Sequence, residues 1–346
     1  MRFKSPLEAS KYAESKREEI APASSSAEKY ARGTETVERN SPIYKRIFEL
    51  QGEIERHGPM DYRKYAKLFW REATGSDADE GNKNFQVFER NFIANMHDIP
   101  MRDLVYTHVL ELMPRLIEKY ADSIKHLSLW SKGDVAATGY QVAKIESSRI
   151  AHDFMREIAR QVSKETRRSF LEQKTSYDVA DDKFENLIWH VGQTLDSSDD
   201  QVKVVIIEDS YKSFDAARQV IENALGKEAA RRVDVEPIWA VYSREGTRAR
   251  EEGRLSMDDF RKKHANVRPI ESFEELMDDK RFGELFRDAH VFVDFDGVIG
   301  DNLRMRDVQA SVTLTAGIDG LLGEWGVSRE EARQRLERRI ASKENG

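Results

Sequence analysis

The feature that most constrains the fold is a series of short apolar runs that lead into polar or acidic residues. Residues 202–207 read Val-Lys-Val-Val-Ile-Ile, and the β-branched residues of this run predict a buried strand. Similar runs occur at 126–130, 235–242 and 290–293, separated by segments with helical periodicity. Strands that alternate with helices predict a parallel sheet whose two faces are both covered by helices.

Helical periodicity accounts for most of the remaining chain, because apolar residues recur every three or four positions. The predicted helices are 42–57, 61–73, 84–96, 101–120, 140–170, 213–225, 272–286 and a C-terminal stretch from 304, whose final helix follows Ser328. The apolar residues of the C-terminal stretch have no local partner. We therefore expect residues 310–340 to pack against residues 41–110, since each buried side chain contributes roughly 1.5–3 kcal/mol.

Composition excludes several classes of function. The chain has 346 residues, no cysteine and a formal net charge of −7. Disulfides, thiolate zinc sites and cysteine nucleophiles are therefore excluded, and the charge disfavours a basic nucleic-acid groove or a polybasic membrane face. No apolar run approaches the roughly 18–20 residues of a membrane span, and no hydrophobic signal region follows the N-terminus. We expect a soluble, cytoplasmic protein that binds no membrane; the sequence indicates no oligomeric state.

Acidic residues directly follow two of the predicted strands. Asp294 and Asp296 are two positions apart, so on extended backbone they point to the same side. The other strand leads into Glu208 and Asp209. Because the carboxyl ends of parallel strands meet at one edge of a sheet, these side chains are expected to converge. Four converging carboxylates are costly to keep ionised without a cation, and Mg²⁺ suits carboxylate oxygens, water and phosphate.

The third strand end carries hydrogen-bond donors rather than acidic groups. The run 126–130 leads into Ser131 and Lys132, followed by Gly133. A hydroxyl and an ammonium group at this position would bind a phosphate group opposite the metal ion. The three strand ends together predict a Mg²⁺ site that acts on a phosphorylated substrate.

The segments at these strand ends resemble motifs of the haloacid dehalogenase-like (HAD) hydrolase superfamily. Residues 294–298, Asp-Phe-Asp-Gly-Val, resemble its first motif, DxDG(V/T). Residues 129–134 are similar to the second motif, and residues 206–210, Ile-Ile-Glu-Asp-Ser, resemble the fourth, acidic motif. Residues 237–248 and 269–276 are similar to the closing strand and helix of the family.

The order of the motifs departs from the family, because its first motif comes last in this chain. A circular permutation accounts for this order if the chain ends lie within the cap that many members insert after the first motif. The resemblance implies an α/β fold with a Rossmann-like parallel sheet core, similar to HAD proteins, and a mostly helical cap domain. The divisions implied are a charged N-terminal arm at 1–40, a first part of the cap at 41–115, the core at 116–303 and a second part of the cap at 304–346. The strand 290–293 is then expected between 203–207 and 126–130, parallel to both.

The resemblance also implies roles for the acidic residues. Asp294 would attack the phosphorus atom and form an aspartyl-phosphate. Asp296 would protonate the leaving oxygen and later deprotonate the hydrolytic water. Both residues, together with Asp209 and Glu208, would hold Mg²⁺.

Phosphate binding is assigned by the same resemblance to Ser131, Lys132 and a third-motif lysine. We choose Lys183 for that lysine, because it precedes a helix that leads back towards the acidic strand. Lys174 is the alternative.

The function implied is that of a Mg²⁺-dependent phosphatase, a phosphomonoester hydrolase that acts on a small phosphorylated metabolite through an aspartyl-phosphate. A dehalogenase is disfavoured, because that branch of the family lacks the second Asp. The alternatives are a phosphotransferase or mutase at the same site, a polynucleotide-end phosphatase, and a non-catalytic helical scaffold with a HAD-like fold. A nucleic-acid substrate is disfavoured by the net charge of −7 but stays open.

Overall fold

The computed structural model describes residues 35–344 except for positions 36, 40, 56–61, 77, 79–80, 98–100, 133–139, 181–183, 198–199, 211, 244–257, 259, 261, 263 and 296. These residues divide into two compact units. One contains residues 105–132 and 147–302, and the other contains residues 35–104, 140–146 and 303–344. Along the chain, the first boundary between the two units follows residue 104. The first part of the cap was expected to end at residue 115. Most of the proposed arm, residues 1–40, lies outside the described residues.

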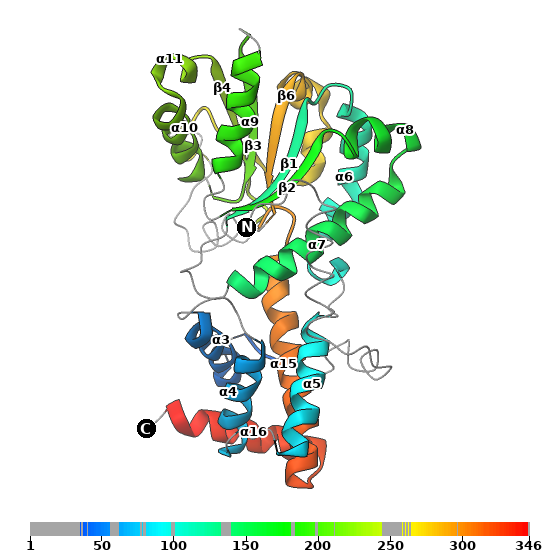
Figure 1. The fold of residues 1–346 in the computed structure, drawn as a ribbon, viewed down its shortest axis with the longest axis vertical. Coiled ribbons are helices and arrows are strands. Elements are labelled where there is room, and N and C mark those ends of the chain that lie inside the picture. Colours follow the sequence, from blue (N-terminus) through cyan, green and yellow to red (C-terminus); the bar gives the residue numbers. More distant parts are fainter. Residues whose placement is uncertain are drawn as a thin grey trace. The chain divides into compact units, whose positions relative to one another are not determined.

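The first unit contains a six-stranded sheet in which all neighbouring strands are parallel (Figure 1). Its order is β2-β1-β6-β3-β4-β5. The strands are β1 (His126–Lys132), β2 (Thr175–Ala180), β3 (Val202–Glu208), β4 (Val233–Ala240), β5 (Arg268–Ile270) and β6 (Ala289–Asp294). The last strand in sequence, β6, pairs with β1 on one side and β3 on the other. This confirms the central position expected for strand 290–293, and every residue of β6 is buried, as a strand covered on both faces requires.

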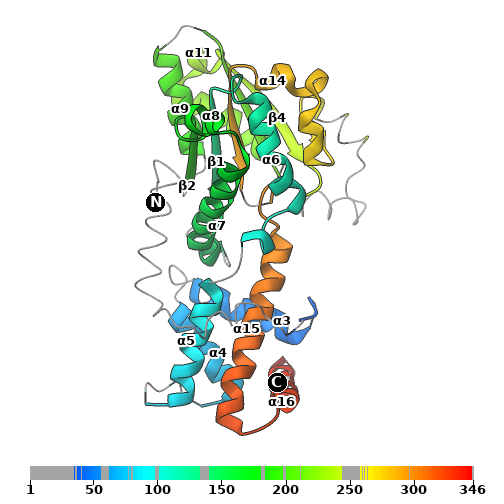
Figure 2. The same cartoon turned by 90° about the vertical axis from the view of Figure 1, so that its right-hand side faces the viewer.

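Helices cover the two faces of this sheet. Leu187 and Val191 of α9 and Phe214 of α10 pack on one face, against inward-pointing residues of β1, β3 and β6. Helix α6 lies over the other face (Figure 2). The helices and turns of this unit are α6 (Thr107–Tyr120), α7 (Tyr140–Gln161, of which residues 140–146 belong to the second unit), α8 (Lys164–Thr166), η2 (Arg167–Leu171), α9 (Phe184–Ser197), α10 (Lys212–Leu225), α11 (Lys227–Ala230), η3 (Phe273–Met277), η4 (Asp279–Gly283) and α14 (Glu284–Phe286). The sheet and its two helical layers give an α/β fold.

Two predicted helices of this unit are interrupted. The helix expected over 140–170 ends at Gln161, because the Ser163 side chain accepts a hydrogen bond from the Thr166 N–H and starts a new turn. The helix expected over 272–286 consists of three short pieces. Asp278 has extended backbone between the first two, and its side chain accepts a hydrogen bond from the Lys280 N–H. Local capping therefore overrides the apolar periodicity in both segments.

The second unit is helical. Its described elements are α3 (Pro42–Glu55), α4 (Tyr62–Thr74), α5 (Lys83–His97), η1 (Met101–Asp103), α15 (Asn302–Trp325) and α16 (Arg329–Glu344). Helices from the two ends of the sequence pack together here: Asn84 of α5 donates a hydrogen bond to Glu324 of α15 at 3.0 Å, and the Arg339 guanidinium of α16 donates to the Glu72 carbonyl of α4 at 2.9 Å. This confirms the expected packing of residues 310–340 against residues 41–110.

Aromatic side chains of α4 and α5 form the centre of this unit. The rings of Trp70 and Phe88 have centroids 5.4 Å apart, and both side chains are almost completely buried. Glycine allows α15 to approach them closely, because a Cβ built on Gly320 would lie 2.7 Å from the Cβ of Phe88. The aromatic periodicity of α4 and α5 thus serves packing.

Candidate functional site

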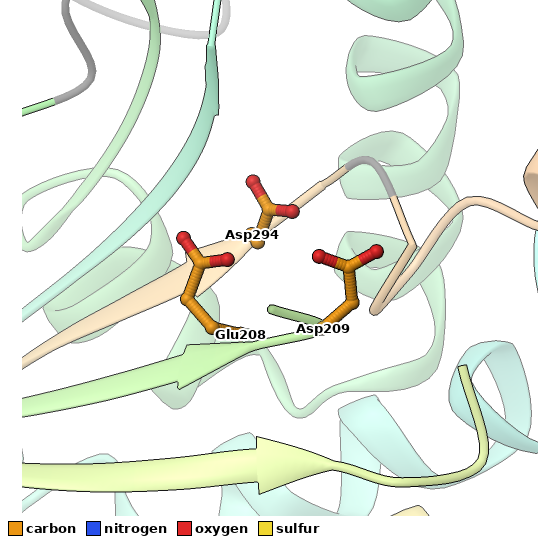
Figure 3. A group of neighbouring side chains, drawn as sticks. All are labelled: Glu208, Asp209 and Asp294. Carbon is orange, nitrogen blue, oxygen red and sulfur yellow. The ribbon is translucent and has the colours of Figure 1, made fainter. Parts of the chain in front are cut away.

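Three carboxylates meet at the carboxyl ends of the two central strands β3 and β6. The register pairs Ile207 with Val293, so the next residue of each strand, Glu208 and Asp294, reaches the same edge of the sheet. Asp209 follows directly. One ligand oxygen from each of the three side chains lies within 4.8 Å of the others, and Figure 3 shows all three pointing to the same side of the strand ends.

The environment of this cluster is unusual for carboxylates. Glu208 is 0 % exposed and Asp294 is 4 % exposed, while Asp209 is half-buried. Burial and mutual repulsion both disfavour three ionised groups so close together. A hard divalent cation with oxygen ligands relieves both costs, and a set of three carboxylates from two strand ends fits the preference of Mg²⁺ for oxygen.

The turn that follows β6 lies close to the carboxylate of Asp209. The Phe295 N–H donates to the Trp130 carbonyl at 2.7 Å, and the Gly300 N–H donates back to the Phe295 carbonyl at 2.7 Å. Gly297 within this turn has φ +103°, and any Cβ at that position would collide with the Asp209 carboxylate. Glycine is therefore required both by the left-handed backbone and by the close approach.

The end of β4 supports the cluster from the other side of β3. The Trp239 indole N–H donates to the Asp209 carbonyl at 2.8 Å, and the Tyr242 hydroxyl donates to the Val298 carbonyl at 3.0 Å. Sequence reasoning missed both contacts, because it interpreted Trp239 only as a core residue of the predicted strand 235–242. The available signal was the position of Trp239 and Tyr242 at the carboxyl end of that strand.

The remaining candidate residues are placed as follows. Ser131 and Lys132 are the last two residues of β1, and their backbone pairs with residues 179 and 180 of β2. This puts them at the same end of the sheet as the carboxylates, since Trp130 pairs with Asp294. Asp296 and Lys183 lie outside the described residues.

Lys174, the alternative residue for binding phosphate, lies at the other end of the sheet from the carboxylates. It immediately precedes β2, and its Nζ contacts the Ile124 carbonyl at 3.5 Å and lies 5.9 Å from the centre of the Phe170 ring. These neighbours belong to the amino end of the sheet. Strands advance about 3.3 Å per residue, so four residues of strand separate Lys174 from the level of Asp294 by roughly 13 Å.

Comparison with known proteins found no matching family model, no similar characterised protein and no similar solved structure. Among the helices that the structure describes, none is both long enough and apolar enough to cross a membrane.

Proposed function

We propose that this protein is a Mg²⁺-dependent phosphomonoester hydrolase of the HAD type, with its motifs in circularly permuted order and the helical second unit as its cap. The observation that carries the proposal is the convergence of Glu208, Asp209 and Asp294, whose ligand oxygens lie within 4.8 Å of one another at the ends of adjacent parallel strands. Acidic strand ends are common, but two buried carboxylates with a third, half-buried one so close to them are costly to keep ionised without a cation.

The strand order supports the same proposal. The resemblance implied that the strand leading to the DxD motif lies between the strands of the fourth and second motifs. β6 lies between β3 and β1 and is parallel to both, although it is the last strand of the chain.

The proposed chemistry assigns a task to each acidic group. A carboxylate oxygen of Asp294 attacks the phosphorus atom, so the bond to the leaving oxygen breaks and an aspartyl-phosphate forms. Asp296 gives a proton to the leaving oxygen and later takes one from the water that hydrolyses the acyl phosphate. Glu208 and Asp209, with Asp294, would hold Mg²⁺, which when bound offsets the negative charge of the phosphoryl group.

The substrate phosphate needs further donors at the same edge of the sheet. Ser131 and Lys132 at the end of β1, together with Lys183 after β2, are proposed to bind its oxygens. The proposed substrate is a small phosphorylated metabolite, because the net charge of −7 disfavours a polynucleotide.

The test is a phosphate-release screen over sugar phosphates, nucleotides and phosphoamino acids, with and without Mg²⁺. Asp294→Asn should lower turnover by on the order of 10³-fold or more, because it removes the nucleophile. Asp234→Asn is the matched control, since Asp234 is exposed at the amino end of β4. Absence of Mg²⁺-dependent release across the screen, or a D294N variant as active as D234N, contradicts the proposal.

A further inference from the structure

Two side chains near the end of β4 donate hydrogen bonds to the two segments that carry the acidic cluster. Trp239 donates to the carbonyl of Asp209, on the β3 side. Tyr242 donates to the carbonyl of Val298, in the turn that follows Asp294 on the β6 side. The end of β4 thus contacts both halves of the proposed Mg²⁺ site through backbone carbonyls.

The Tyr242 hydrogen bond spans the end of β3. In the sheet order β6-β3-β4, β4 pairs with β3 but not with β6. The turn after β6 therefore crosses the end of β3 before Val298 reaches Tyr242. On the way, Gly297 comes so close to the Asp209 carboxylate that no Cβ fits between them. The hydrogen bond from Tyr242 to Val298 contacts the part of this turn that lies beside the end of β4.

The Tyr242 hydroxyl is held as a permanent donor. Burial raises the pKa of Tyr242 well above its ordinary value, and the charges of Tyr106 and Asp209 raise it further. The ring is also fixed, because His108 and Tyr106 contact it edge-on, with centroids 4.8 Å and 5.5 Å away. A protonated hydroxyl on a fixed ring donates the same hydrogen bond throughout the physiological pH range.

We propose that Tyr242 is a positioning residue that sets the separation of the Asp294 and Asp209 carboxylates and thereby the affinity of the site for Mg²⁺. This inference rests on the proposed function. Mg²⁺ demands near-ideal octahedral geometry with short oxygen contacts, so a small displacement of one carboxylate weakens binding. Backbone hydrogen bonds of Ile299 with Phe295 and Tyr106 still hold the turn when the hydroxyl is removed, so the loss permits a small shift of the turn beside the Asp209 carboxylate.

The experiment compares Tyr242→Phe with Tyr120→Phe in the full chain. Each variant removes one tyrosine hydroxyl that donates a hydrogen bond; Tyr120 donates to Asp279 at 2.9 Å, between α6 and η4. Calorimetry measures the binding of Mg²⁺ alone. Y242F should raise the Kd for Mg²⁺ about tenfold, because Mg²⁺ binding must then restore the turn geometry without the roughly 1.4 kcal/mol that this hydrogen bond contributes to it. Y120F should leave that Kd unchanged.

Phosphate release provides a second readout that a general loss of stability would not reproduce. In Y242F the Mg²⁺ concentration for half-maximal activity should rise by the same factor of about ten, while kcat at saturating Mg²⁺ stays within about twofold of wild type. Equal Mg²⁺ affinity in Y242F and wild type, or an equal loss in Y242F and Y120F, overturns the positioning role and leaves the proposed function standing. A wild-type protein that binds no Mg²⁺ overturns both.

Discussion

Three histidines inside the first unit should make its stability depend on pH. His126 of β1, His190 of α9 and His290 of β6 form a cluster, with the rings of the first two 4.0 Å apart and that of His290 6.4 Å from each. His290 is 7 % exposed, and its Nε2 lies 3.1 Å from the Thr194 hydroxyl, so the side chain is packed in the interior of the unit. Protonation would place like charges together in the core.

The pKa shifts give the size and sign of the effect. Burial, with a smaller contribution from Lys125, lowers the pKa of His290 from 6.5 to about 4. Burial, with smaller contributions from the other two histidines, lowers the pKa of His126 to about 3. Between these values and 6.5 the unfolded chain binds more protons than the folded one, so stability is lost as the pH falls. From pH 7 to pH 5 the loss is about 2 kcal/mol for each of these two histidines.

Urea unfolding of the full chain at pH 7, 6 and 5 measures this loss, and His290→Gln isolates one contribution to it. Glutamine does not titrate and can still reach the Thr194 hydroxyl. Between pH 7 and pH 5, the free energy of unfolding should therefore fall by about 2 kcal/mol less in H290Q than in wild type. This difference does not depend on how stable H290Q is at pH 7. His264→Gln, which replaces a histidine outside the cluster, is the matched control for the substitution itself. An H290Q protein with the pH dependence of wild type would refute the reasoning.

Two glycines yield further predictions. Gly320→Ala should destabilise the helical unit by about 1–3 kcal/mol, because the new methyl group meets the Phe88 Cβ at 2.7 Å. Gly323→Ala should cost less than Gly320→Ala, since its methyl group meets only the Asn84 amide oxygen, at 3.1 Å, and alanine favours the helix. Thermal unfolding of both variants checks the contrast. Gly297→Ala should weaken Mg²⁺ binding at least about tenfold, because a Cβ displaces the Asp209 carboxylate and the φ of +103° is strained. Calorimetry that finds wild-type affinity in G297A would show that the turn tolerates the methyl group.

The central strand and its acidic end were predictable from sequence because local patterns encode them. An uninterrupted apolar run at 291–293 indicates a strand buried on both faces, and the acidic residues after it mark the end that faces solvent or ligand. Strand polarity alone placed Asp294, Glu208 and Asp209 at the same edge of the sheet. The pairing of β6 with β1 and β3 required the family resemblance as well, since sequential order alone favours an edge position.

Other features depend on tertiary contacts that no local pattern encodes. β2 was missed because Thr-Ser-Tyr-Asp-Val-Ala has a single aliphatic β-branched residue, and its pairing with β1 stabilises it. The role of Tyr242 arises from the turn after β6, which brings the Val298 carbonyl to the end of β4. The role of Trp239 arises from the residue that follows β3, Asp209. Lys174 could be rejected only once the register showed which end of β2 it precedes.

The most direct test of the proposed mechanism is to locate the phosphoryl group on the enzyme. The full chain is incubated with Mg²⁺ and acetyl phosphate, quenched in acid, digested and mapped by mass spectrometry. The account predicts a phosphoryl group on the peptide that contains Asp294, absent without Mg²⁺ and absent in D294N. Phosphorylation on another peptide, or a Mg²⁺-dependent phosphatase activity that persists in D294N, would contradict it.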